Sequence, residues 1–146
     1  MGKLYDSDFY GWTIQQADAL KRRSVNELDW ENLIEEIESL GRSEARELRS
    51  HYRLLLLHLL KWQFQPTLRS RSWEATLTSQ RAEAAQVLTE NPGLKPRTDE
   101  IFASAYSLAR LDAMKETGFG LSTFPEVSPY TRAQAMDETF FPGPIE

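Results

Sequence analysis

Carboxylates and histidines are the first side chains in this sequence whose spacing suggests chemistry. Glu31, Glu35 and Glu38 stand four and three positions apart, so on a helix they share one face. Carboxylates on one helix that face a histidine on another are a common way to build a metal site in a helix bundle. The chain has two histidines, His51 and His58. Glu35 or Glu38 with His58 is therefore a candidate catalytic group for a hydrolase or nuclease, with an optional divalent ion.

The positions of the two histidines argue against such a metal centre. His51 and His58 are seven residues apart, about 10.5 Å along a helix axis, so one ion cannot bind both. A tight antiparallel turn at Gly41 would place His51, rather than His58, beside Glu31. We therefore expect no metal ion and no other cofactor, and we interpret the glutamates as a solvated acidic face. His58 is interpreted as a buried structural histidine with Glu35 as one candidate partner.

A second set of candidates combines cations, aromatic rings and amides between positions 61 and 81. These binding candidates are Lys61, Trp62, Gln65, Arg69, Arg71, Trp73, Gln80 and Arg81. Basic side chains at the start of a helix attract phosphate, and tryptophans stack on bases. The same residues also suit a corner fixed by cation–π contacts and ion pairs. We favour this structural interpretation over a ligand site.

Charge and composition limit the classes of partner. The net charge is −5, but residues 41–81 carry a net charge of +5 between two segments of −5 each. A nucleic-acid-binding domain is usually basic overall, so this alternative is disfavoured and pairing within the molecule is favoured. The chain has no cysteine, which excludes disulfides and thiolate chemistry.

The apolar pattern predicts an all-α protein, a single-domain bundle of about five helices with a long central helix and a C-terminal tail that carries a short helix. The expected helices span residues 6 or 8 to 23, 29–40, 43–65, 70 or 72 to 91, and 96–117, with the short one at 131–138. Gly41 is expected to end the second helix, and Ser43 to cap the third. The stripe in residues 29–40 is expected to face the bundle core: Trp30, Leu33, Ile34, Ile37 and Leu40.

We expect residues 1–146 to form one domain, with a bundle over 1–123 and a tail over 124–146 that packs back on it. The longest apolar run, Leu54–Leu60, is far shorter than the roughly 20 residues that span a bilayer. The N-terminal segment has no apolar stretch of the kind a signal peptide needs. The protein is therefore expected in the cytoplasm, without membrane contact.

Several segments together resemble one known family. They are LYDSDFYGWT near the N-terminus, LDWENLIEEIESLGRSE at 28–44, HLLKWQFQP at 58–66, RSRSWEATLTSQR at 69–81, NPGLKP at 91–96 and FPEVSPYTRAQAMDETFFP at 124–142. In order and in content they resemble the bacterial family called domain of unknown function twenty-nine. The resemblance implies a small, cytoplasmic α-helical protein, and it carries no activity. Its pattern falls on Glu35, Glu36, Gly41, His58, Lys61, Trp62, Gln65, Arg71, Trp73, Gln80 and Arg81, and it leaves out His51.

Three hypotheses for the function follow. The favoured one is a non-enzymatic binding or interaction domain with a protein partner of unspecified identity. The alternatives are a nucleic-acid or phosphate binder that uses Arg69, Arg71, Trp73 and Arg81, and a hydrolase that uses Glu35, Glu38 and His58. Enzymatic activity and oligomeric state stay open at this stage.

Overall fold

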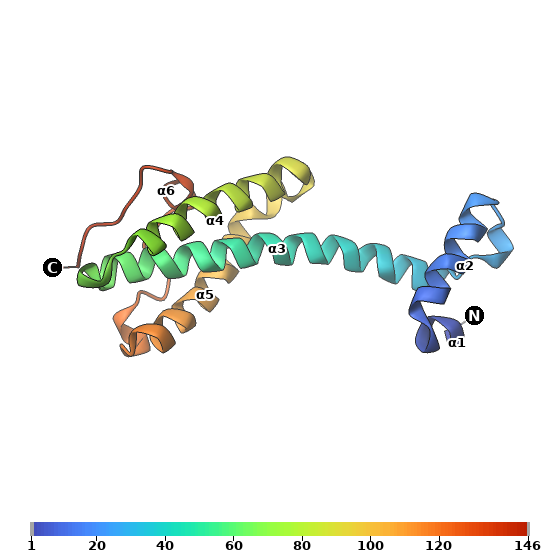
Figure 1. The fold of residues 1–146 in the computed structure, drawn as a ribbon, viewed down its shortest axis with the longest axis horizontal. Helices are drawn as coiled ribbons and strands as arrows, with labels where there is room; N and C mark the ends of the chain where they lie inside the picture. Colours follow the sequence, from blue (N-terminus) through green and yellow to red (C-terminus); the bar gives the residue numbers. More distant parts are fainter. Residues whose placement is uncertain (1, 146) are drawn as a thin grey trace. The chain divides into compact units, whose positions relative to one another are not determined.

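The computed structural model describes residues 2–145, with side chains from Leu4 onward. Within that range every regular element of secondary structure is a helix, and there is no β-strand. The α-helices are α1 (Gly2–Ser7), α2 (Phe9–Lys21), α3 (Trp30–Phe64), α4 (Arg71–Glu90), α5 (Thr98–Thr117) and α6 (Arg132–Met136) (Figure 1). The expected fold class, all-α with one long central helix, is confirmed. No helix in this range has both the length and the apolar character needed to cross a bilayer.

The chain divides into two compact units, Met1–Ser43 and Glu44–Glu146. The N-terminal unit contains α1, α2 and the first part of α3. Its buried side chains are few: Trp12, Gln16, Ala19, Leu28 and Asp29. Because three of these five carry hydrogen-bonding groups, polar contacts as well as apolar packing hold this unit together.

The helix α3 runs without a break through the position where we expected a turn. Gly41 lies inside it, and it does not adopt the left-handed conformation that ends a helix, because Gly118 is the one glycine with positive φ among the described residues. A single interior glycine costs a helix only about 1 kcal/mol, which its neighbours offset. Arg42 contributes to that balance, since its guanidinium donates to Glu35 at 2.8 Å. The predicted turn at Gly41, and the separate helices on either side of it, were therefore wrong.

The C-terminal unit holds the main apolar core. Helices α4 and α5 both lie along the C-terminal part of α3 (Figure 1). From α3 the core takes Leu48, Tyr52, Leu55, Leu56, Leu57, Leu59 and Leu60, and α4 adds Leu77, Ala84 and Val87. Residues of α5 complete it, with Phe124, Tyr130 and Ala135 from the tail. An α3 that is apolar on several sides is thus surrounded by other elements, as its sequence predicted.

Local sequence signals fix the ends of these helices. Ser70 caps α4 by accepting from the backbone N–H of Trp73, and Thr131 forms a capping box with Gln134 at the start of α6. Gly118 ends α5 with φ of 77°, a conformation that favours glycine. These three caps confirm the predicted helix ends at those positions.

Candidate functional site

The N-terminal unit leaves a stripe of large apolar side chains uncovered on α3. Trp30, Ile34, Ile37 and Leu40 are 55%, 54%, 67% and 65% exposed. The prediction that this stripe faces a core was wrong for these four residues, because the expected hairpin at Gly41 does not form and nothing in the unit covers them; Leu33, the fifth residue of the predicted stripe, is half-buried. Helical periodicity identifies an apolar face but does not say what packs against it. Contiguous exposed apolar patches of this kind mark interaction surfaces.

A buried polar network positions the start of this stripe. Asp29, directly before α3, accepts hydrogen bonds from the Trp12 indole at 2.9 Å and from the Asn32 amide at 2.8 Å. Its own backbone N–H donates to the Gln16 side chain at 2.7 Å, and the Gln16 amide donates to the Glu27 carbonyl at 3.2 Å. The network fixes how α2 meets α3. Sequence reasoning missed it, although an aspartate before a helix is a recognisable cap signal.

Aromatic contacts join α1 and α2 to the same unit. The Tyr5 and Trp12 rings meet edge to face with centroids 4.8 Å apart, and Phe9 stacks on Trp12 at 5.6 Å. The Tyr5 hydroxyl donates to Glu36 of α3. This bond, with nearby carboxylates, raises the pKa of Tyr5 to about 12. Glu36, one of the residues on which the family pattern falls, thus anchors α1 and is not free to bind a partner.

The acidic candidates lie beside the exposed stripe. Glu31, Glu35 and Glu38 are all exposed on α3, and Glu35 is paired with Arg42. Among the described residues no cluster of three or more histidines and carboxylates is placed to hold a metal ion. The arrangement gives an apolar surface with a row of negative charge along one side.

His58 does not meet either carboxylate proposed as its catalytic partner. It lies in the same unbroken helix as Glu35 and Glu38, and side chains of one helix meet only three or four positions apart. Its ring nitrogen Nδ1 instead lies 2.9 Å from the Leu54 carbonyl. Burial lowers the pKa of His58, and the nearby Lys61 adds to this. The predicted contact of His58 with Glu35 was wrong, for the same reason as the predicted turn.

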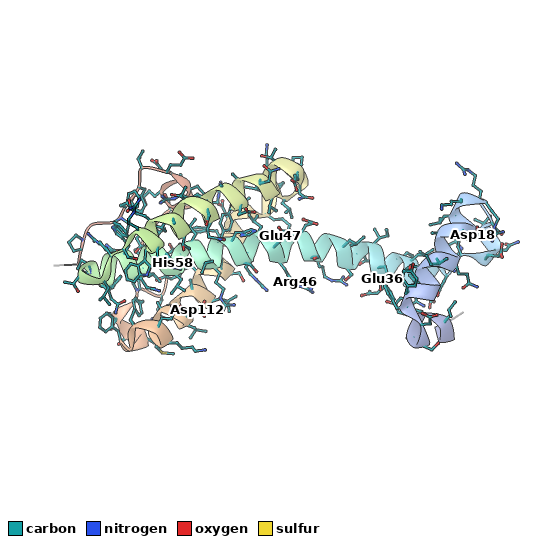
Figure 2. The ribbon with its side chains drawn as sticks, viewed as in Figure 1. Asp18, Glu36, Arg46, Glu47, His58 and Asp112 are labelled. Carbon is teal, nitrogen blue, oxygen red and sulfur yellow. The ribbon has the colours of Figure 1, made fainter. Side chains whose placement is uncertain are left out.

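The other histidine packs between helices. His51 Nδ1 lies 2.7 Å from the Gln80 side-chain oxygen on α4, and its Nε2 is 3.7 Å from Glu47. Gln80, considered above as a binding residue, therefore joins α3 to α4. Figure 2 labels Glu47 and His58 on α3.

The corner between α3 and α4 brings several of the basic candidates together. Arg69 donates to the Trp62 carbonyl at 2.8 Å, and its guanidinium lies 4.9 Å from the Trp62 ring centre. Lys61 pairs with Glu116 at 3.0 Å and lies 4.9 Å from the Trp73 ring centre. Phe141 of the tail packs against Trp62 with ring centroids 5.0 Å apart. These are the cation–π and ionic contacts of the structural interpretation.

Arg81 is the most buried cation of the set and binds the tail. It is 3% exposed, and it donates to the carbonyls of Ala135 at 2.7 Å, Phe140 at 2.7 Å and Glu138 at 3.4 Å. Its guanidinium also lies 5.6 Å from the Phe141 ring centre. Donors that are occupied by tail carbonyls have little left to offer a phosphate.

Two candidates remain outside these contacts. Arg71 is exposed at the start of α4, and Gln65 is partly buried at the end of the α3 segment. No side-chain hydrogen bond joins either of them to the corner residues. The structure thus unites Lys61, Trp62, Arg69 and Trp73 in one corner, and Arg81 joins them through the tail.

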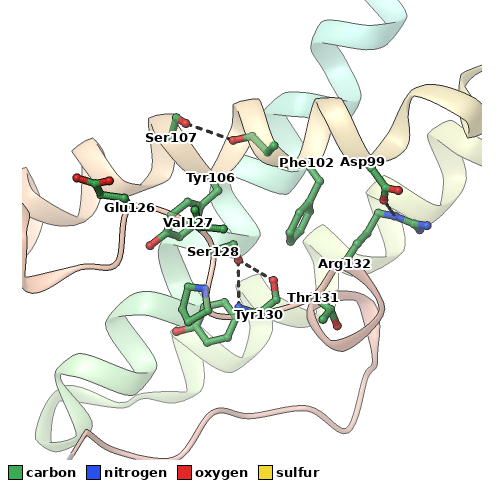
Figure 3. A pocket seen from close by; sticks show the side chains of 12 residues that line it. Asp99, Phe102, Tyr106, Ser107, Glu126, Val127, Ser128, Tyr130, Thr131 and Arg132 are labelled. Atoms are coloured by element: carbon green, nitrogen blue, oxygen red, sulfur yellow. Dashed lines mark hydrogen bonds and ion pairs between the residues drawn. The ribbon is translucent and has the colours of Figure 1, made fainter.

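A pocket of about 520 Å³ lies between α5 and the tail, and sequence reasoning did not find it. Figure 3 shows Phe102, Tyr106 and Tyr130 lining it, with the pair formed by Arg132 and Asp99 at one end. The Arg132–Asp99 distance is 3.1 Å. Ser128 bonds to the backbone of Tyr130, so its hydroxyl is occupied in holding the loop. No nucleophile paired with a base occurs among the lining residues, and the pocket suggests no reaction.

The chain matches, over residues 4–141, the family model described as Domain of unknown function DUF29. No curated protein and no solved structure matches it.

Proposed function

Because the chain belongs to the DUF29 family, whose description assigns no activity, we propose a function from the geometry of the chain itself: it is a non-enzymatic domain that docks a helical protein partner. The docking face is the exposed α3 stripe of the N-terminal unit, formed by Trp30, Ile34, Ile37 and Leu40. The observation that carries this proposal is the exposure of four large apolar side chains at helical spacing.

Charge selects the kind of partner. Glu31, Glu35 and Glu38 lie exposed along the docking face, and Arg42 offsets only one of them. A partner helix with apolar residues beside a row of basic residues would match both features, since amphipathic helices dock through their apolar side and flanking charges set the orientation.

The rival functions have less support. The hydrolase requires a carboxylate beside the His58 ring. The Nδ1 atom of that ring instead lies 2.9 Å from the backbone carbonyl of Leu54. The nucleic-acid binder requires free cations, and two of its three basic residues, Arg69 and Arg81, are engaged by backbone carbonyls and aromatic rings. A phosphate binder would also lose affinity steeply with added salt, which a binding assay at two ionic strengths would show.

A peptide-binding experiment tests the docking face. The probe is a fluorescently labelled amphipathic peptide of leucine and lysine, and an equivalent peptide of leucine and glutamate is its control. We expect wild-type protein to bind the lysine peptide preferentially. Ile34→Ser combined with Ile37→Ser should weaken that binding about tenfold or more, because two apolar anchors are lost.

Leu111→Ser provides a matched control variant. Leu111 is also an exposed apolar residue on a helix, 44% exposed on α5. It lies outside the docking face, so its substitution should leave peptide affinity unchanged. Equal losses in both variants, or no loss in the Ile34/Ile37 variant, would show that the stripe is not the docking face.

A further inference from the structure

We propose that the pocket between α5 and the tail binds a small molecule with an apolar body and a single carboxylate, which accepts hydrogen bonds from Arg132 and from the hydroxyl of Tyr52. The pocket and both donors lie within the C-terminal unit, so this inference is independent of the docking face. The volume of about 520 Å³ falls within the roughly 300–1,000 Å³ of pockets that bind small molecules.

Aromatic rings form the walls of the pocket. Phe102, Tyr106 and Tyr130 line it (Figure 3). The Tyr106 hydroxyl is engaged elsewhere, because it donates to the Pro125 carbonyl at 2.6 Å. The Tyr130 hydroxyl likewise donates to the Gln63 side chain at 2.6 Å. The two tyrosines therefore contribute ring carbons to the pocket rather than free hydroxyls, and the walls suit an apolar ligand.

Val127 adds an apolar wall that the protein itself leaves uncovered. Its side chain lines the pocket (Figure 3) and is 81% exposed, more than any other large apolar residue in the described part of the chain. A ligand in the pocket would shield part of this surface from water. Removing apolar surface from water favours binding.

Arg132 supplies the positive charge at one end of the pocket. Its Nε–H donates to Asp99 at 3.1 Å, and this is its one side-chain hydrogen bond in the part of the chain that the structure describes. A guanidinium carries five N–H donors, so most of its capacity remains. Two of these donors match the two oxygens of a carboxylate, which makes a carboxylate the anion that fits this end best.

A buried hydroxyl without a partner lies beside this cation. The Tyr52 side chain is fully buried, and its hydroxyl has no hydrogen-bond partner among the described residues. Its ring packs edge to face against Phe102, with centroids 5.4 Å apart. Burial raises the pKa of Tyr52, and Arg132 acts in the opposite direction because its guanidinium is close to the hydroxyl. A buried donor without an acceptor is unfavourable, and a ligand oxygen beside Arg132 would satisfy it.

The ligand carboxylate would compete with Asp99 for Arg132. The Tyr52 hydroxyl is closed to solvent, so a ligand reaches it only when the guanidinium turns from Asp99 toward the pocket. Asp99 is exposed, and Arg132 is partly exposed. An exposed ion pair is weak, so breaking this one opposes the movement only slightly.

Glu126 limits the ligand to one carboxylate. It lines the pocket on the side away from Arg132 (Figure 3). It is exposed, and no cation pairs with it in the described part of the chain. A second carboxylate at that end of the ligand would meet a like charge, which is unfavourable.

Isothermal titration calorimetry with three compounds of equal chain length tests the site. The probe is octanoate, octanamide is its neutral control, and suberate carries a second carboxylate at the other end. We expect octanoate to bind about tenfold or more tightly than either control, because charge-assisted hydrogen bonds need one carboxylate and Glu126 repels the second. A wild type that binds none of the three, or all three equally, would overturn the proposal.

Two substitutions at the ion pair should act in opposite directions. Arg132→Gln should weaken octanoate binding about tenfold or more, because it removes the charge that holds the carboxylate. Asp99→Asn should strengthen binding severalfold, because it removes the competing carboxylate. If the pair only held the tail in place, both variants would change the affinity in the same direction, and that result would also overturn the proposal.

Arg97→Gln is the matched control. Arg97 pairs with Glu100 on the surface of the same unit, and it does not line the pocket. Its substitution should leave octanoate affinity unchanged. Equal losses in the Arg97 and Arg132 variants, or no loss in either, would show that Arg132 does not hold the carboxylate.

Tyr52→Phe tests the hydroxyl. It should weaken octanoate binding severalfold, because the ligand loses one donor. The thermal unfolding midpoint of the unliganded protein should not fall, because the hydroxyl has no partner to lose. An unchanged affinity in this variant, with the fold intact by circular dichroism, would overturn the role assigned to Tyr52.

Discussion

The indole of Trp12 donates a hydrogen bond of 2.9 Å to the buried carboxylate of Asp29, which lies 17 residues further along the chain. The Asn32 amide donates to the same oxygen. These donors, Asn32 first, hold the pKa of Asp29 below its usual range, although burial acts in the opposite direction. Asp29 is therefore charged in the folded protein, and it ties the beginning of α3 to α2.

Asp29→Ala should destabilise the N-terminal unit by about 2 kcal/mol, because it leaves the Trp12 and Asn32 donors without a partner. Hydrogen exchange of residues 9–36 measures the effect locally. Asp18→Ala is the control, since Asp18 pairs with Arg22 on the surface of α2 and should contribute about 0.5 kcal/mol or less. Similar exchange in the two variants would contradict the role assigned to Asp29.

Two glycines should respond to alanine in opposite directions. Gly41→Ala should raise the stability of α3 by about 0.5–1 kcal/mol, because Gly41 is inside a helix and its Cβ would meet no atom. Gly118→Ala should cost about 1 kcal/mol or more, because φ is 77° there. Thermal unfolding followed by circular dichroism compares the two variants. Loss of stability in Gly41→Ala would instead favour a turn at that position.

Arg81→Met should release the tail. It removes the donors to the carbonyls of Ala135, Glu138 and Phe140, at an expected cost of about 2–4 kcal/mol in the C-terminal unit. Urea unfolding gives the stability, and limited proteolysis shows whether residues 132–145 become accessible. Arg71→Met on the same helix is the control: Arg71 is exposed, so its loss should change neither measurement.

His58 should make stability depend on pH. Burial holds the pKa of His58 below the ordinary value of about 6.5, so the folded protein binds fewer protons than the unfolded chain just below that value. Stability therefore rises as pH increases through this window and levels off above it. Urea midpoints at about pH 5.5 and about pH 7.5 should differ in wild type and less so in His58→Gln. An undiminished difference in the variant would assign the dependence to other groups.

The sequence predicted helix type and several helix ends well, because caps and apolar periodicity are local signals. Ser70, Gly118 and Thr131 each act through a backbone bond within a few residues. It failed at Gly41, because glycine is compatible with both a helix end and a helix interior, and the contacts of neighbouring residues decide between them. Because of that single error, the predicted neighbours of Trp30, Ile34 and His58 were also wrong.

The sequence predicted which kinds of side chain gather at the candidate sites, but not which groups those side chains contact. The cations between Lys61 and Arg81 do gather aromatic rings, as their spacing suggested. The partners of Arg81, however, are carbonyls of the tail, more than 50 residues away in the sequence. Backbone carbonyls leave no trace in the sequence, so no pattern of residues could show that these donors are occupied.

The hydrogen bonds from Arg81 to the tail also have a consequence for biosynthesis. A nascent chain that has emerged only as far as α5 carries a guanidinium whose acceptors, at Ala135, Glu138 and Phe140, have not yet left the ribosome. The C-terminal unit can therefore complete its fold only after the chain has emerged as far as Phe140. A prematurely terminated chain would keep an unsatisfied cation beside an open apolar core, which is the kind of feature that cellular quality control recognises.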